Sequence, residues 1–582
     1  MLNDFLTKTI NWNKKNRVSL FLLCSLINLC MFWFLCSYGH PIFATNDDFR
    51  MRLIVSGRFT GTPISQVPFI SPILSNVLSM LYSFNKNFEW YGIIFESFLL
   101  ISIIVIEYIF LKKSKTVKHL LFNSFVLLML SVILYEKQII MLQFTTVSAY
   151  LGAASIACLF EAKNLYIKDN IIKKNYILLS LIFFSLSMIV RRLVCVMFIP
   201  IYCILVLFTI EKNIPMKIKK TFLVVLLLFL AIYGSLRSYH LFYNHSDDAY
   251  QEYLDFNVIR SKLFDYDTIA DYAKNKELYE YYDISVSEYK AISGRSYTII
   301  PEFDIEFANK MIAIKEEANK QESVVNELIT STYKTYGLLF GGEVRYSFLA
   351  VLLIFLYCVI FQEIDNRDIN IILLTILYIF VFTIYFYIKG RMMPRIVEAF
   401  SITLTAIILC SYRDVEVNTS EYRKRIRYYV YTFLLIITAI ANQYSLTEDP
   451  NAIRETILYK TEQLNTLRRY VQKNPDNFYF YNANDFIAST EYVFNHSNKI
   501  ENMDSLGNWY FRSPAYFERN AIFGIKTPLD SINESKSVFY VELNKWHSPI
   551  NEYVIDNGHY FREKEKIEKE NYTIIIYKVL SY

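Results

Sequence analysis

Two adjacent carboxylates, Asp47 and Asp48, follow a long apolar run in the segment FATNDDFRMRL, which begins at residue 43. A carboxylate at the boundary between lipid and water can orient a hydroxyl group and accept its proton while the oxygen attacks the anomeric carbon of a lipid-linked sugar. The same residues fit a structural role, in which Asn46 or Asp47 caps a short helix that lies along the membrane surface with Phe49 on its apolar face. The sequence leaves open which of the two acids would be the base.

Basic residues stand at the predicted outer ends of membrane spans, where they are uncommon. They are Arg191, Arg192, Lys389, Arg391 and Arg395. The planar guanidinium group matches phosphate oxygens, so we predict that this set binds the phosphate of a lipid-linked donor. Two alternatives are that the side chains extend to lipid headgroups, and that Arg395 pairs with Glu398.

No second catalytic motif accompanies these residues. The seven histidines lack metal-ligand spacing, and the sequence has no HExxH, CxxC or phosphate-binding glycine motif. No cofactor is therefore predicted with certainty. A divalent metal ion held by the acidic pair and a pyrophosphate is left open.

The composition indicates which elements hold these residues. Of 582 residues, 54% are hydrophobic, and the mean hydropathy is +0.24 with the apolar residues in long blocks. This is the composition of an integral membrane protein. The formal net charge of +5 is small and scattered along the chain, so no nucleic-acid partner is predicted.

A helix needs ~20 apolar residues to cross the hydrocarbon core of a membrane. We predict about eleven transmembrane helices on that criterion. They lie at 18–39, 92–111, 119–135, 139–160, 176–190, 193–210, 221–239, 347–361, 369–388, 397–412 and 428–446. The basic residues of the short loops all fall on one side if the N-terminus is cytoplasmic, which places the C-terminus outside.

The long polar segments then face the exterior. We expect an N-terminal transmembrane module (1–239) with a first exterior loop (40–91), a helical, tyrosine-rich exterior loop (240–346), a second transmembrane module (347–446) and an exterior tail (447–582). The tail begins with a helical pattern at 451–473 and continues with strand patterns at 478–482, 538–543 and 572–580. These patterns predict a small C-terminal α/β domain.

An acidic pair in the first exterior loop, large exterior segments and arginines on later exterior turns resemble the C-type superfold of glycosyltransferases, which use polyprenyl-phosphate sugar donors. The segments NDDFRMRLIVSGRFTGTP, WYGIIFE, EYLDFNVIRSKLFDY, GRMMPRIVEAF and GNWYFRSPAYF are also similar to a group of bacterial membrane proteins associated with surface-glycan synthesis. The resemblance implies that Asp47 or Asp48 is the acid of the first exterior loop.

These observations favour a polytopic membrane glycosyltransferase that acts on the outer face of the bacterial cytoplasmic membrane. Its expected partners are a polyprenyl-phosphate sugar donor, a surface glycan or lipid-linked acceptor, and membrane lipid. The tyrosine-rich loop and the tail are expected to bind the acceptor, because aromatic faces stack against sugar rings. The alternatives are a polymerase of polysaccharide repeat units, and a non-enzymatic flippase or other transporter of lipid-linked oligosaccharides.

Overall fold

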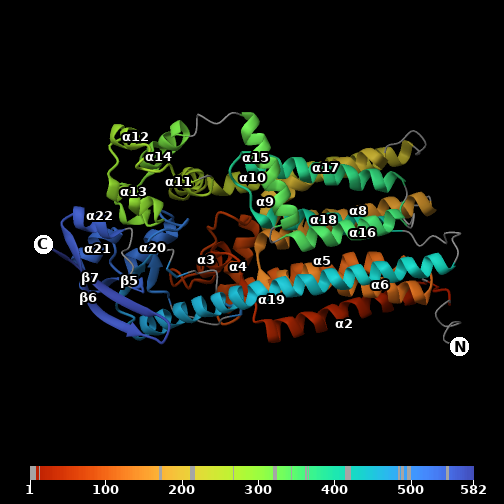
Figure 1. The fold of residues 1–582 in the computed structure, drawn as a ribbon, viewed down its shortest axis with the longest axis horizontal. Helices are drawn as coiled ribbons and strands as arrows, with labels where there is room; N and C mark the ends of the chain where they lie inside the picture. Colours follow the sequence, from red (N-terminus) through yellow and green to blue (C-terminus); the bar gives the residue numbers. More distant parts are fainter. Residues whose placement is uncertain are drawn as a thin grey trace.

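The computed structural model describes residues 8–11, 13–169, 173–209, 216–266, 268–318, 324–341, 344–360, 364, 366–412, 421–482, 485–486, 491–494, 500–544 and 550–582. Two short pieces of the predicted cytoplasmic loops, 170–172 and 211–215, lie outside the described residues. The long apolar helices lie side by side at one end of the molecule, and the polar segments gather at the other, which we call the polar end (Figure 1).

Eight helical segments of the described chain are long and apolar enough to cross a membrane. They are Lys14–Gly39 (α2), Trp90–Leu111 (α5), Val117–Ile140 (α6 to α7), Phe144–Tyr166 in α8 (Phe144–Asp169), Lys174–Leu207 in α9 (Lys174–Thr209), Lys219–Asn244 in α10 (Met216–Asn244), Asn366–Ile388 (α17) and Pro394–Ser411 (α18). A pair bent by 79° in α15 (Val324–Gly341) and α16 (Arg345–Ile360) makes a ninth if it is one span. The chain is a multi-pass membrane protein, and the number eleven stays a prediction.

Helix α9 folds back on itself at Arg191. This residue has φ −154° and ψ 99°, which is not helical. The ring centroids of Phe184 and Tyr202 lie 5.6 Å apart, although an uninterrupted helix would separate residues so far apart in sequence by ~27 Å. The two halves of α9 are therefore antiparallel, and the reversal falls between the predicted segments 176–190 and 193–210.

The first polar segment contributes α3 (Asn46–Ser56) and α4 (Pro72–Phe84) to the polar end. The middle segment contributes α11 (Asp248–Phe264), α12 (Lys276–Tyr281), α13 (Val286–Ser293) and α14 (Ile305–Ala318). A capping box between Ser285 and Glu288 begins α13. The helical character predicted for this segment is confirmed.

Helix α19 (Glu421–Lys473) runs from the apolar end into the polar end as one element (Figure 1). The expected boundary between the second transmembrane module and the tail, at residues 446 and 447, therefore falls inside a helix. Beyond α19, the strands are β3 (Phe478–Tyr481), β4 (Met503–Ser505), β5 (Val538–Leu543), β6 (His559–Glu568) and β7 (Thr573–Ser581). The three strands predicted in the tail are confirmed.

These strands form one mixed sheet in the order β4-β3-β5-β7-β6. Strand β3 is parallel to β4 and β5, whereas β7 is antiparallel to β5 and β6. Side chains alternate between the two faces. Tyr479 and Val541 pack with Leu467 of α19, whereas Phe478 and Tyr540 belong to the core shared with α20 (Pro514–Ile522) and α21 (Pro528–Glu534). The sheet therefore lies between α19 and the later helices of the tail.

Candidate functional site

Helix α3, which carries the acidic pair, is held at its start by two short parallel strands. Strand β1 (Ile42–Phe43) pairs with β2 (Met141–Leu142), and the Ala44 amide donates to the Leu142 carbonyl at 2.9 Å. The pairing brings the start of α3 next to the start of α8. The helix ends at Gly57, which has a positive φ of 76° and whose Cβ, if present, would lie 2.7 Å from the Pro63 nitrogen.

Two expectations about α3 are wrong. The N-cap is Thr45, whereas Asn46 and Asp47 lie in the first turn of the helix. All residues from Asp48 to Ser56 are buried, so α3 does not lie along a membrane surface with one apolar face. It is enclosed because the tail covers the side that would otherwise face water (Figure 1).

Asp48 is fully buried and joins three segments of the chain. Its Oδ1 accepts hydrogen bonds from the Tyr91 hydroxyl at 2.9 Å and from the Phe144 amide at 3.0 Å, and its Oδ2 accepts one from the Thr45 hydroxyl at 3.0 Å. Burial raises the pKa of Asp48 to about 7, and the hydrogen bonds from Tyr91 and Phe144 oppose the rise. Its acceptor capacity is largely used by the protein, which favours a positioning role.

Asp47 points into different surroundings and remains partly exposed. Burial raises the pKa of Asp47, and the guanidinium groups of Arg395 and Arg191 act against burial. Arg260 also lowers this pKa, whereas Asp265 raises it. Three arginines and one further acid therefore lie within electrostatic range of Asp47, whose carboxylate is partly exposed.

Arg191 reaches this position because α9 reverses there. Its guanidinium carbon lies 4.3 Å from the centroid of the Phe144 ring, whose backbone amide binds Asp48. The hydroxyl of Ser148 donates to the Arg191 carbonyl at 3.3 Å, and the Ser71 amide donates to the Ile189 carbonyl at 2.9 Å. One buried terminal nitrogen of Arg191 has no hydrogen-bond partner among the described residues. Such a nitrogen is suited to an anionic ligand.

Arg192 lies beside Arg191 on the wall of a cavity of about 90 Å³. The cavity is lined by Pro68, Phe69, Ile70, Ser71, Met188, Arg191, Arg192, Leu193, Leu236 and His240. Arg237 is close enough to Arg192 for electrostatic repulsion, and no ion pair joins either residue to a carboxylate of the described chain. The cavity is therefore basic as well as apolar.

The remaining cations of the predicted phosphate-binding set differ from one another. Arg391 donates to the Tyr266 hydroxyl at 3.1 Å and pairs with Asp265 at 3.3 Å, so its charge is partly neutralised. Lys389 is exposed. Arg191 and Arg395 therefore lie within electrostatic range of Asp47, and Arg391 lies within range of Arg191, whereas no interaction among the described residues joins Lys389 to this group.

The predicted alternative of an ion pair between Arg395 and Glu398 is wrong. Glu398 accepts from the Lys137 ammonium group at 2.6 Å and from the Gln138 side chain at 3.3 Å. Arg395 instead interacts electrostatically with Asp47 and Arg191. The positive charge of Arg395 therefore acts on the region around the acidic pair.

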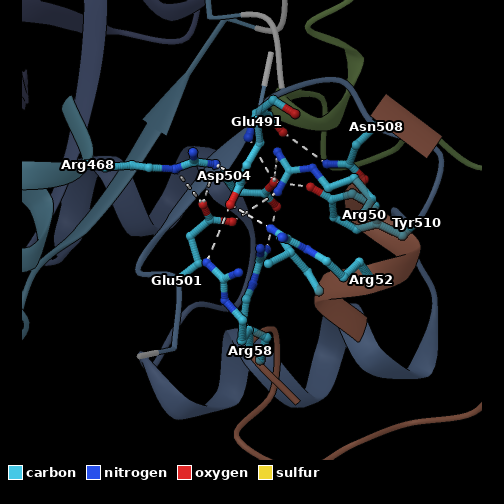
Figure 2. Close-up of polar contacts among 12 residues, drawn as sticks. Arg50, Arg52, Arg58, Arg468, Glu491, Glu501, Asp504, Asn508 and Tyr510 are labelled. Atoms are coloured by element: carbon cyan, nitrogen blue, oxygen red, sulfur yellow. Dashed lines mark hydrogen bonds and ion pairs between the residues drawn. The ribbon is translucent and has the colours of Figure 1, made fainter. Parts of the chain in front are cut away.

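A second group of charges lies where α3 packs on the tail, and its members are buried or only partly exposed (Figure 2). We call it the ionic cluster, and it consists of Arg50, Arg52, Arg58, Arg468, Glu491, Glu501 and Asp504. Its three carboxylates belong to the tail, and three of its arginines belong to the first polar segment, whose own Glu89 also pairs with Arg52 at 3.5 Å. The cluster therefore joins the tail to the helix that carries Asp47.

Glu491 is the centre of this cluster. Its carboxylate pairs with Arg52 at 2.5 Å, Arg468 at 2.6 Å and Arg58 at 3.7 Å. Burial alone would raise the pKa of Glu491, but the charges of Arg468, Arg52 and Arg58 outweigh burial and lower it to about 2. Glu501 pairs with Arg50 and with Arg468, each at 3.3 Å. The packing of α3 on the tail therefore depends on the ionised carboxylates of Glu491 and Glu501, because these pair with the arginines of both segments.

Sequence reasoning missed the ionic cluster, although Arg50 and Arg52 stand in the segment that was analysed for its acids. The available signal was two arginines alternating with Phe49, Met51 and Leu53, because a charge within an apolar run needs a buried partner. Arg52 has one partner nearby in the sequence, Glu89 at 3.5 Å, but Glu491 and Glu501 lie more than 400 positions away, and spacing in sequence carries no information about them.

The described residues include no group of three or more His, Cys, Asp and Glu side chains that is arranged to hold a metal ion. Asp47 and Asp48 do not converge on one point, because Asp48 is turned toward Tyr91 and Phe144. The site is therefore characterised by one accessible carboxylate and a group of arginines.

No family model matches the sequence, and a comparison with curated proteins finds no match. Among solved structures, the chain is similar to the crystal structure of ArnT from Cupriavidus metallidurans bound to undecaprenyl phosphate. The TM-score is 0.38 at 9% sequence identity, and the match covers 97% of this chain and 98% of that chain. A TM-score this low does not identify a function.

Proposed function

We propose that the chain is a membrane glycosyltransferase that moves a sugar from a polyprenyl-phosphate donor to a glycan on the outer face of the bacterial cytoplasmic membrane. The observation that carries the proposal is the position of Asp47, a partly exposed carboxylate beside Arg191, Arg260 and Arg395 at the polar end of a multi-pass membrane protein. Attack of a hydroxyl on a phosphate-linked sugar requires a base and stabilisation of an anionic leaving group, and Asp47 and these arginines are residues of the kinds that could supply them.

Asp47 is the base in this proposal. Its carboxylate accepts the proton of the acceptor hydroxyl as the oxygen bonds to the anomeric carbon, and the bond from that carbon to the phosphate oxygen breaks. The electron pair of the broken bond leaves with the polyprenyl phosphate. Asp48 positions the helix, because its three hydrogen bonds tie α3 to α5 and α8.

Arg191 and Arg395 stabilise the leaving phosphate, with Arg192 contributing from the cavity beside the reversal of α9. The fork of a guanidinium group can donate two parallel hydrogen bonds to phosphate oxygens. The cavity has apolar lining from Phe69, Met188 and Leu236, which suits the first carbons of a lipid chain. Donor and acceptor would then meet at Asp47 from opposite sides.

Deletion of the protein from the cells that make it tests the proposed activity. We expect one sugar to be lost from the surface glycans while the length of the polymers stays normal, and expression of the wild-type chain should restore that sugar. A glycan that keeps its full sugar composition but is shortened would instead identify a polymerase of repeat units.

A further inference from the structure

A second cleft, of about 360 Å³, lies between the middle segment and the tail at the polar end. Its lining residues are Ala249, Glu252, Tyr253, Phe256, Asp304, Ile305, Arg512, Pro514 and Phe517. Helix α11 contributes the residues from Ala249 to Phe256, which stand on one of its faces. Asp304 and Ile305 lie at the start of α14, and the residues from Arg512 to Phe517 lie at the start of α20. Two helices of the middle segment and one helix of the tail therefore build one cleft.

The apolar part of the cleft is aromatic. Tyr253 and Phe256 are almost fully buried and form its floor, whereas Phe517 is 54% exposed. An exposed phenylalanine at a cleft offers a flat apolar face to a ligand. The floor is fixed, because the Tyr253 hydroxyl donates to the Trp509 carbonyl at 3.1 Å.

The polar part of the cleft offers both acceptors and donors. Glu252 is exposed, and Asp304 has one carboxylate oxygen committed to the amide of Phe307 at 2.9 Å. Arg512 is held at a positive φ of 66°, which is uncommon for a residue other than glycine, and it donates to the Phe303 carbonyl at 3.0 Å. An aromatic face with carboxylates and a guanidinium group around it suits the hydroxyls and the apolar face of a sugar ring.

Packed side chains connect the cleft to the acidic pair. Trp509, whose carbonyl accepts from Tyr253, packs on Phe69 with ring centroids 4.8 Å apart. Phe69 in turn stacks on Phe144, whose amide binds Asp48.

Burial raises the pKa of the Tyr253 phenol, and Asp47 is among the charges that add to the rise, so Asp47 lies within electrostatic range of the floor of the cleft. The cavity with Arg192 is lined by residues of the first polar segment, α9 and α10, and it shares no lining residue with the cleft. Asp47 interacts with a lining residue of each.

We propose that this cleft binds a saccharide, and that the saccharide is the acceptor of the transfer reaction. The inference rests on the proposed function for the role of the bound sugar, whereas binding itself does not depend on catalysis. The volume is at the lower end of the range of small-molecule sites, roughly 300–1,000 Å³, which fits one or two sugar rings. In this proposal, the ring of Phe517 stacks on a sugar ring. Glu252, Asp304 and Arg512 form hydrogen bonds with the sugar hydroxyls.

Saturation-transfer NMR on the full chain in lipid nanodiscs tests this inference, because nanodiscs avoid detergents that carry sugars. The probes are oligosaccharides of two to four sugars, released by mild acid from the envelope of cells that produce the protein. We expect binding to the wild-type chain, roughly tenfold weaker binding to Phe517→Ala and near-normal binding to Phe517→Tyr. Phe84→Ala, which removes another exposed phenylalanine outside the cleft, should bind as the wild type does.

The Asp47→Asn variant separates this inference from the proposed function. We expect it to bind the oligosaccharides normally while transferring no sugar. If Asp47→Asn transferred sugar normally and the Phe517 series behaved as expected, the catalytic proposal would fail and the cleft would stand. Absence of oligosaccharide binding to the wild-type chain, or equal binding by Phe517→Ala and the wild type, would overturn the inference.

Discussion

Asp47 and Asp48 have the same side chain and adjacent positions, and their surroundings give them different chemistry. Three hydrogen bonds hold Asp48 inside the protein, whereas Asp47 meets arginines at a partly exposed position. The sequence could predict that an acid acts here but not which one, because one helical position turns a side chain by ~100° and the packing decides what each side chain meets.

The pH dependence of transfer should report the surroundings of Asp47. Burial raises its pKa above the ordinary value of 3.8, and the charge of Arg395 holds the rise down. The reaction needs the ionised carboxylate, so transfer should fall as the pH drops through this raised pKa. Arg395→Gln removes an opposing charge and should move the acidic limb of the initial-rate profile to higher pH. If the acidic limb of the profile stayed at the same pH or moved to lower pH, the placement of Arg395 beside the base would be contradicted.

Arg191 should not tolerate lysine if it binds the donor phosphate. Lysine supplies the charge without the planar fork, so Arg191→Lys should lower transfer at limiting donor by roughly tenfold or more, and Arg191→Ala should lower it further. The control is Arg17→Lys, which changes an arginine at the opposite end of the membrane helices. Full activity of Arg191→Lys would mean that this side chain reaches lipid headgroups instead.

At the scale of elements, the sequence predicts where chemistry-bearing residues stand but not what covers them. The separate spans predicted at 176–190 and 193–210 agree with the reversal of α9 at Arg191, and short apolar or alternating patterns predict the strands of the tail. The burial of α3 could not be predicted in this way, because Arg50 and Arg52 meet Glu501 and Glu491 only when the tail packs on α3. Long-range ion pairs leave no periodic signal in a single sequence.

Glu491 should be essential for the packing of α3 on the tail. Removal of one partner from a buried, hydrogen-bonded ion pair costs roughly 3–5 kcal/mol, because the remaining charges stay buried and unpaired. Glu491→Ala should therefore lower the thermal midpoint of the full chain by several degrees or more. Glu280→Ala is the matched control, since Glu280 belongs to an exposed pair with Lys276 at 3.4 Å and should change stability by less than ~1 kcal/mol.

Acid provides an independent check on the same carboxylate. The pKa of Glu491 is lowered in the folded chain from 4.5 to about 2, so its contribution to stability is fully present above pH 4.5 and is lost as the pH falls toward 2. The wild-type chain should lose stability over this window, and Glu491→Gln should lose less. Equal acid sensitivity of both proteins would show that Glu491 is not ion-paired in the folded state.

At the scale of the whole molecule, the two ends depend on one another. Helix α19 passes from the membrane part into the tail without interruption, and carboxylates of the tail pair with Arg50, Arg52 and Arg58. Composition and hydropathy predict the multi-pass architecture and the long polar segments. They cannot show that segments about 400 residues apart share one core, because this depends on side-chain contacts across the fold.

The tail should therefore be less stable alone than in the full chain. A fragment of residues 447–582 keeps Arg468 with Glu491 and Glu501 but loses the three arginines of the first polar segment. We expect its melting transition, followed by circular dichroism, to lie well below that of the tail in the full chain, if the fragment melts cooperatively at all. A soluble fragment with the same midpoint as the intact protein would identify an independent domain.

The central claim is that Asp47 accepts a proton during sugar transfer, and transfer by purified Asp47→Asn in lipid vesicles tests it most directly. Asparagine preserves size and helix position, so the variant should insert and melt like the wild type while transfer falls by at least about a hundredfold. Asp48→Asn should retain far more activity, because an amide oxygen can still accept from Tyr91 and Phe144. Near-normal transfer by Asp47→Asn, with donor and acceptor both saturating, would contradict the account.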